Sequence, residues 1–205
     1  MAAPGCCPSF EATPSVDARY RRVLWLALAI NAAMFAVEAG FGLIADSLSL
    51  QADALDFFGD AANYAISLAL LGRAIRWRAR GAAIKGGAMA LFGAWVLGAA
   101  IYRVFVGGVP DAAIMGAIGL LALFANLACA VLLFRFRRGD SNMRSVWLCT
   151  RNDAIANIAV ILAALAVAVT GTGWADLGVA VVIASLAASA GISVIRQAHA
   201  ELRTA

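Results

Sequence analysis

The stretch DSLSLQADALDFFGDAANYAISLALLG, residues 46–72, decides the fold because it places three carboxylates inside a long apolar run. In lipid, an ionised side chain at the bilayer centre costs about 3 kcal/mol or more. Asp53, Asp56 and Asp60 stand at i, i+3 and i+7, so their side chains share one face of a helix. We therefore expect this face to lie against protein or water, with something nearby that offsets its charge.

The composition of the whole chain is that of a membrane protein. Of its 205 residues, 63% are hydrophobic and 14% are charged, and the mean hydropathy is +0.87. Soluble domains, by comparison, are about half apolar. A helix needs about 20 apolar residues to cross the hydrocarbon of a bilayer. On that template we predict six spans, at about residues 22–45, 48–72, 83–106, 112–135, 145–169 and 175–195.

These spans predict an all-α membrane protein with six transmembrane helices in one domain, residues 21–198. The connections between the spans are too short to hold a further folded domain. We expect residues 1–20 to form a disordered N-terminal tail and residues 199–205 to form a short C-terminal tail.

The basic residues indicate how the helices are oriented. They gather before the first span, between the second and third (where Lys85 is counted), between the fourth and fifth, and after the sixth. The positive-inside rule then predicts that both termini are cytoplasmic. The net charge of +4 thus reflects topology, and no nucleic-acid partner is expected. Short connections and the lack of a targeting sequence favour a bacterial cytoplasmic membrane.

A second polar face lies in the fifth predicted span, WLCTRNDAIANIAVILAA, where Cys149, Asp153 and Asn157 stand at i, i+4 and i+8. At about 1.5 Å per residue, Asp60 and Asp153 lie roughly 20 Å and 14 Å from the basic ends of their helices. These depths differ by about one helical turn. The two polar faces can therefore meet near the middle of the membrane.

Two interpretations of these faces are open. In the first, the polar side chains form hydrogen bonds between helices and only hold the bundle together. In the second, they bind a divalent cation, which cancels the repulsion among crowded carboxylates and can be replaced by protons when it leaves. Four acids and a thiol at matching depth favour the cation.

Other polar residues allow more than one role. Asn31 and Glu38 share a face of the first span, and Glu38 is either a proton carrier, a cavity-lining acid or a neutral carboxyl bonded to a neighbouring helix. Asp53 either passes protons or departing metal, or lies in a wet vestibule. Cys6 and Cys7 either capture a soft metal or belong to an inert tail.

Two motifs resemble the cation diffusion facilitator family, whose members are proton-coupled efflux transporters of divalent transition metals. GFGLIADSLSLQADALDFFGDAAN is similar to the family's first loop and second helix, and CTRNDAIANIAVILAA is similar to its fifth helix. WADLGVAVVIASL also resembles the start of the sixth helix. The resemblance covers residues 20–198 and implies a tetrahedral metal site made by Asp56, Asp60, Cys149 and Asp153.

The chain departs from the family pattern in two ways. Cys149, which is either a metal ligand or a small residue packed within the bundle, stands where the family commonly has His, and the chain stops where most members continue into a cytoplasmic metal-binding domain. Three carboxylates and a thiolate favour Zn²⁺ or Cd²⁺ and leave Co²⁺, Fe²⁺ and Mn²⁺ open. Asn157 either orients Asp153 or is a weak ligand. The lack of that domain leaves open whether the chain forms a homodimer through its helices.

The sequence thus predicts a metal/proton antiporter whose partners are divalent metal ions, protons and the lipid bilayer, with no resident cofactor. An alternative is a non-transporting interaction protein whose acids brace helices, and another is an uncoupled cation or proton pathway. We do not expect an enzyme, because there is no Ser/His/Asp set, no phosphate-binding loop and no His within the predicted spans.

Overall fold

The protein is a bundle of long helices in a computed structural model. The structure describes residues 18–69, 75–134 and 141–204, with the side chains of residues 18, 20, 75, 76, 78, 141–152 and 204 outside that description. Its described part holds six helices and no strand, which confirms the predicted all-α fold. The helices are α1 (Ala18–Ile44), α2 (Leu48–Ala69), α3 (Ile75–Val106), α4 (Ala112–Phe134), α5 (Ser141–Thr170) and α6 (Trp174–Thr204).

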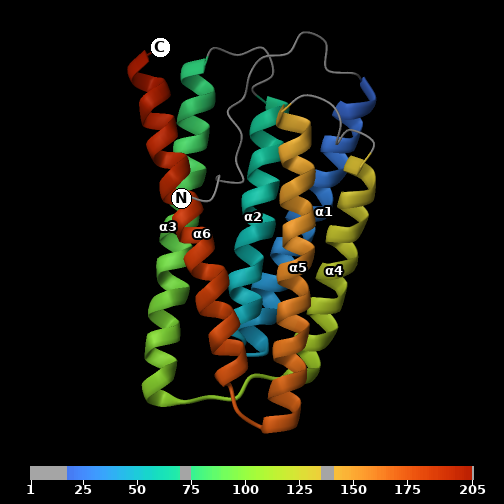
Figure 1. Ribbon diagram of the computed structural model, residues 1–205, viewed down its shortest axis with the longest axis vertical. Helices are drawn as coiled ribbons and strands as arrows, with labels where there is room; N and C mark the ends of the chain where they lie inside the picture. The colour runs from blue at the N-terminus through green and yellow to red at the C-terminus, as the bar shows by residue number, and fades with distance from the viewer. Residues whose placement is uncertain (1–17, 70–74, 135–140, 205) are drawn as a thin grey trace.

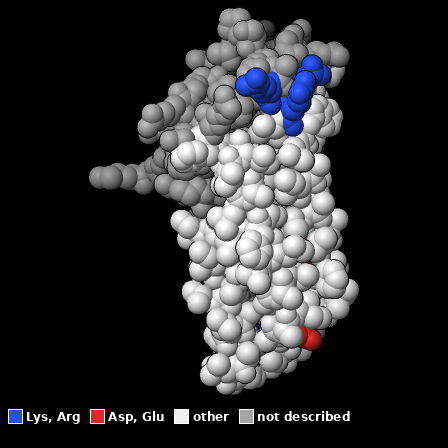
Figure 2. Space-filling model, turned by 90° about the vertical axis from the view of Figure 1, so that its right-hand side faces the viewer, with Lys and Arg blue, Asp and Glu red and all other residues white. Residues whose placement is uncertain are grey.

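The helices run alternately up and down, so that α1 begins and α6 ends at the same end of the bundle (Figure 1). On the face seen in Figure 2, basic side chains gather at one end above a broad band without charge. In the described part of the chain, five segments are long and apolar enough to cross a membrane. They are Arg21–Ile44, Ala79–Val106, Ala112–Phe134, Asp153–Thr170 and Trp174–Arg203.

The remaining helix, α2, lies at the centre of the bundle. It contacts each of the other five helices, most extensively α1 and α6. Its 22 residues span about 33 Å, enough to cross the hydrocarbon beside its neighbours. This position lets α2 carry three aspartates, because its polar face meets protein rather than lipid.

Helices α3 and α6 form a closely packed pair on one side of the bundle (Figure 1). A Cβ atom added to Gly86 would lie 2.7 Å from the carbonyl oxygen of Gly191, and one added to Gly191 would lie 2.6 Å from that of Gly86. A Cβ atom added to Gly93 would likewise lie 3.0 Å from the carbonyl oxygen of Ala184. Small residues thus let the two backbones touch, as is common between membrane helices.

α3 and α6 extend furthest beyond their predicted spans. α3 begins at Ile75 rather than near residue 83, and α6 continues to Thr204 rather than ending near residue 195. In the last turns of α6, Gln197 donates a hydrogen bond to Glu201, four residues on, at 3.2 Å. The hydropathy pattern predicts only the apolar part of each helix. The polar residues at these ends continue the helix beyond that part.

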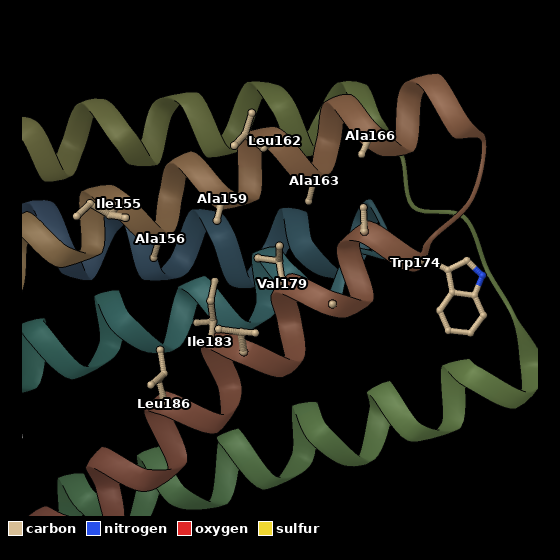
Figure 3. Close-up of a pocket in the computed structure, with 13 residues that line it drawn as sticks. Ile155, Ala156, Ala159, Leu162, Ala163, Ala166, Trp174, Val179, Ile183 and Leu186 are labelled. Carbon is tan, nitrogen blue, oxygen red and sulfur yellow. The ribbon is translucent and has the colours of Figure 1, made fainter. Parts of the chain in front are cut away.

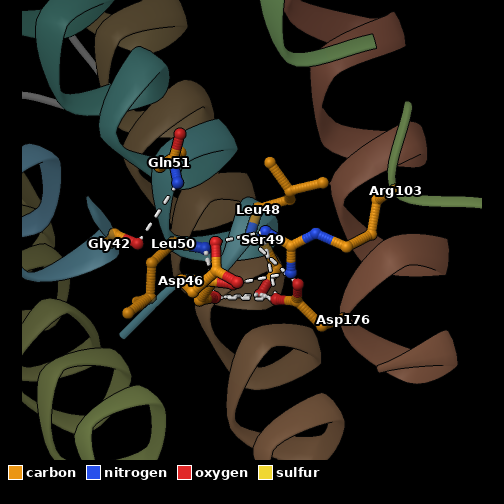
Figure 4. Close-up of polar contacts among 9 residues, drawn as sticks. Gly42, Asp46, Leu48, Ser49, Leu50, Gln51, Arg103 and Asp176 are labelled. Carbon is orange, nitrogen blue, oxygen red and sulfur yellow. Dashed lines mark hydrogen bonds and ion pairs between the residues drawn. The ribbon is translucent and has the colours of Figure 1, made fainter. Parts of the chain in front are cut away.

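A set of hydrogen bonds, which we call the loop clasp, ties the α1–α2 connection to the first turn of α6 (Figure 4). The buried Asp176 carboxylate accepts bonds from Ser47 Oγ (2.7 Å), Leu48 N (2.9 Å), Ser49 N (3.0 Å) and Ser49 Oγ (2.6 Å). A carboxylate at this position caps the N-terminus of α2 and complements its dipole. The clasp fixes where α2 begins, and hence the depth of its aspartates.

Arg103 of α3 ties down the same connection from the other side. Its guanidinium forms an ion pair with the side chain of Asp46 and donates a second bond to the Asp46 carbonyl oxygen at 2.9 Å. Asp46 has a φ of 53°, a left-handed conformation that Asp tolerates better than most residues. The connection is therefore held by both helices of the α3–α6 pair.

Candidate metal site

The aspartates of α2 lie in different surroundings. Asp53 is fully buried, whereas Asp56 and Asp60 are partly buried. Glu38 of α1 is also fully buried, and its carboxyl lies close enough to Asp53 and Asp56 for their charges to interact. The Glu38 and Asp53 carboxyls lie within hydrogen-bonding reach of each other, and no other donor among the described residues meets their oxygens. The two acids thus face one another without a positively charged partner in that part of the chain.

Asp60 has polar neighbours of another kind. Its carboxylate accepts a hydrogen bond from Tyr64 OH, one turn along α2, at 3.2 Å. The ammonium group of Lys85, on α3, interacts electrostatically with the same carboxylate. Lys85 also donates a hydrogen bond to the side-chain oxygen of Asn63. Sequence reasoning counted Lys85 among the topological charges, and the structure instead places it inside the bundle.

On α5, Asp153 is partly buried and Asn157 is fully buried. Asn157 Nδ2 donates to the backbone oxygen of Asp153 at 2.7 Å, while Asn157 Oδ1 meets no donor among the described residues. Cys149 lies one turn earlier in the same helix, and its side chain lies outside the described residues, as do Cys6 and Cys7.

Helix α4 lies where the polar faces of α2 and α5 approach each other. The buried Cys129 of α4 lies within electrostatic range of both Asp60 and Asp153. It also accepts a hydrogen bond from Asn31 Nδ2 of α1 at 3.5 Å. In the sequence, the only sign of this polar environment is Asn126, three residues before Cys129.

The described acids are not gathered into a finished metal site. No group of three or more His, Cys, Asp or Glu side chains within the described ranges is close enough to hold a metal ion. Asp60 and Asp153 lie within electrostatic range of Cys129, and Asp53 and Asp56 lie within electrostatic range of Glu38. The chemistry available is that of carboxylates from α2 and α5, which suit a divalent cation once they draw together.

The described residues also form an apolar groove, away from these carboxylates. A groove of about 700 Å³ runs between α5 and α6, lined by apolar side chains such as Ile155, Leu162, Val179 and Leu186 (Figure 3). No charged side chain lines it. A cation has no ligand there, so the groove is separate from the polar faces of α2 and α5.

Comparison with known proteins agrees with this architecture. The family model described as the cation efflux transmembrane domain matches residues 24–202. The chain is 24% identical over 192 residues to a cadmium, cobalt and zinc/H(+)-K(+) antiporter of Bacillus subtilis, covering 86% of this chain and 61% of that protein. It is 27% identical over 174 residues to the metal cation efflux system protein CzcD of Cupriavidus metallidurans, covering 79% and 55%. The chain therefore spans less than two thirds of the length of these relatives.

Proposed function

This chain belongs to the cation efflux, or cation diffusion facilitator, family, and on that premise we propose that it exports a divalent transition-metal ion in exchange for protons. The observation that carries the proposal is that acids of two helices, Asp60 on α2 and Asp153 on α5, both lie within electrostatic range of Cys129 on α4. Acids from two helices that converge inside an apolar bundle suit a cation that neutralises them.

The binding step uses Asp56, Asp60, Cys149 and Asp153 as ligands. Three carboxylates and a thiolate carry enough negative charge to strip water from a divalent ion, and four ligands suit the tetrahedral preference of Zn²⁺. The sulfur of Cys149 favours Cd²⁺ relative to an all-oxygen site. Zn²⁺ and Cd²⁺ are therefore the proposed substrates, ahead of Co²⁺, Fe²⁺ and Mn²⁺. The names of the two relatives include cadmium, cobalt, zinc or metal cation efflux.

Proton exchange follows from the same ligands. A carboxylate or thiolate must lose its proton to bind metal, so protons that arrive from an acidic side compete with the ion and expel it. Glu38 and Asp53 are buried beside Asp56, and we assign them to the proton route. Asn157, bonded to the backbone of Asp153, orients that helix turn.

Alternating access requires one part of the bundle to move against another. The closely packed α3–α6 pair is a natural rigid unit, because glycines place the two backbones in contact. Movement of this pair against α1, α2, α4 and α5 would open the region around Asp60 to each side in turn, as in transporters that bind their substrate at midplane. We further propose a bacterial cytoplasmic membrane as the location, with both termini inside. A homodimer formed through the helices stays a prediction.

The bracing alternative has less support. Acids that hold helices together need hydrogen-bond donors opposite them. Among the described residues, Glu38 and Asp53 have only each other within hydrogen-bonding reach, and two adjacent buried acids weaken a bundle unless a proton or a cation neutralises at least one of them. An enzymatic role is not proposed, since the two relatives are named as transport proteins.

Uptake of metal by inside-out vesicles tests this proposal. Vesicles that contain the chain are offered Zn²⁺, Cd²⁺, Co²⁺, Fe²⁺ and Mn²⁺ in turn, with an imposed pH gradient, and metal inside is measured. We expect uptake of Zn²⁺ or Cd²⁺ that collapses when the gradient is dissipated. Equal uptake with and without the gradient would indicate an uncoupled pathway, and no uptake of any metal would contradict the proposal.

A further inference from the structure

Lys85 is a buried cation within a membrane-spanning helix. Its residue is 4% exposed, and it lies inside the apolar segment Ala79–Val106 of α3. A Lys side chain within a membrane helix is costly, at about 3 kcal/mol for a position at the bilayer centre, and therefore occurs where partners or function require it. The proposed transport steps described above give Lys85 no task.

The packing of α3 against α2 explains what Lys85 reaches. Gly59 of α2 lies against Met89 of α3, so closely that a Cβ atom on Gly59 would be 3.1 Å from the methyl carbon of Met89. The two helices run in opposite directions (Figure 1). One turn from this contact, toward the C-terminal end of α2 and the N-terminal end of α3, Lys85 therefore meets Asn63. The Lys85 ammonium group donates a hydrogen bond to the side-chain oxygen of Asn63.

This contact holds a positive charge next to a proposed metal ligand. Asn63 is three residues after Asp60 on the same helix, and the Lys85 ammonium interacts electrostatically with the Asp60 carboxylate. Because Asn63 follows Asp60 on α2, its bond places Lys85 on the side of Asp60 nearer to the C-terminal end of that helix. Asn63 thus anchors Lys85 at one side of the site.

We infer that Lys85 is a built-in counter-cation of the metal site, which balances Asp60 while the site is empty and opposes the incoming metal ion. The inference rests on the proposed function, because it needs Asp60 to be a ligand. A fixed positive charge makes binding weaker by mutual repulsion with the metal. It also lowers the cost of burying the empty, negatively charged site, so the transporter can return to its inward-facing state without metal. Lys85 therefore lowers the affinity of the site and speeds the release of metal.

Metal binding to the purified full chain in detergent tests this role. Zn²⁺ and Cd²⁺ affinities are measured by competition with a fluorescent chelator for wild type, Lys85→Gln, Lys85→Met, Lys85→Arg and Asp60→Asn. We expect both neutral variants to bind about tenfold more tightly than wild type, because one like charge is removed a short distance from the ion. Lys85→Arg should bind as wild type does, since it keeps the charge. In vesicles, the neutral variants should show a lower maximal rate together with a lower KM.

The outcomes separate this inference from the function on which it rests. If wild type binds metal and Asp60→Asn does not, while Lys85→Gln and Lys85→Met bind with unchanged affinity, Lys85 only braces α2 against α3 and the inference is wrong. A lower melting temperature without tighter binding would lead to the same conclusion. A wild-type chain that binds no metal overturns the proposed function, and the inference falls with it. If Lys85→Gln does not fold, Lys85→Met, which keeps an unbranched side chain one atom shorter than that of Lys, gives the neutral comparison.

Discussion

Asp176 on α6 and Ser49 on α2 are joined by two hydrogen bonds, one from the Ser49 backbone nitrogen at 3.0 Å and one from its hydroxyl at 2.6 Å. The residues are 127 positions apart in the sequence. Together with the bonds from Ser47 and Leu48, this contact ties the start of the central helix to the α3–α6 pair. The depth of the proposed ligands on α2 therefore depends on a carboxylate that does not bind metal.

The loop clasp predicts that Asp176→Asn destabilises the protein. An amide in place of the carboxylate loses acceptor capacity and leaves a buried donor unpaired, which costs about 2 kcal/mol. The matched control is Asp111→Asn, since the exposed Asp111 side chain caps α4 through Ala113 N (2.9 Å) and Ile114 N (3.0 Å), and Asn caps helices about as well as Asp. Thermal melting in detergent checks this. Equal melting temperatures for the two variants would show that the clasp adds little.

Asp53→Asn should have the opposite effect on stability. Asp53 and Asp176 are both buried, yet among the described residues Asp53 has only the Glu38 carboxyl within hydrogen-bonding reach, whereas Asp176 accepts four bonds. Removing a charge that lies beside Glu38 relieves repulsion, so the melting temperature should stay level or rise. Proton-coupled transport should slow. A large loss of stability would mean that the Asp53 carboxylate has a structural partner.

The α3–α6 contact predicts unequal effects of two Gly→Ala changes within α6. At Gly191, an added Cβ would lie 2.6 Å from the backbone oxygen of Gly86, whereas at Gly178 nothing lies within 4 Å. Gly191→Ala should therefore destabilise the protein by about 1–3 kcal/mol through overpacking. Gly178→Ala should be neutral or slightly stabilising, because Ala favours helix more than Gly does. Melting temperatures of both variants decide the matter, and a neutral Gly191→Ala would argue against a rigid pair.

Cys149 is expected to set the choice between metals. Cys149→His replaces a soft ligand by a borderline one, so transport should persist with preference shifted from Cd²⁺ toward Zn²⁺. Cys149→Ser should weaken Cd²⁺ binding, and competition assays on the purified chain measure both. Cys129→Ser is the control, because Cys129 is already engaged by Asn31 and is not a proposed ligand. If Cys149→Ser bound Cd²⁺ as wild type does, the thiolate would not be a ligand.

Much of this architecture follows from local patterns in the sequence. The six helices and the polar face of α2 could be predicted, because both depend on spacing within one segment. The ends of α3 and α6 could not, since helical polar residues beyond the hydrocarbon leave no signal in hydropathy. Asp53, Asp56 and Asp60 were correctly expected to be shielded from lipid, at least in part.

The roles of individual side chains depend on pairings between distant segments, which spacing does not reveal. Nothing near Asp176 in the sequence indicates that it accepts bonds from residues 47–49. Lys85 follows a run of basic residues and was counted with them, although the packing of Met89 against Gly59 carries it into the bundle. The spacing of the α2 aspartates likewise gave no hint that Asp53 lies beside Glu38 and Asp60 beside Lys85.

The most direct test of the central claim is metal-driven proton movement in proteoliposomes that contain wild type, Asp60→Asn, Asp153→Asn or the exposed control Asp111→Asn. A pH-sensitive dye reports protons when Zn²⁺ or Cd²⁺ is added to one side. We expect counter-movement of protons in wild type and in Asp111→Asn, and at least about a tenfold lower rate in both site variants, because a neutral amide neither binds the ion strongly nor exchanges a proton. Undiminished proton movement in Asp60→Asn and Asp153→Asn, from protein that melts as wild type does, would contradict it.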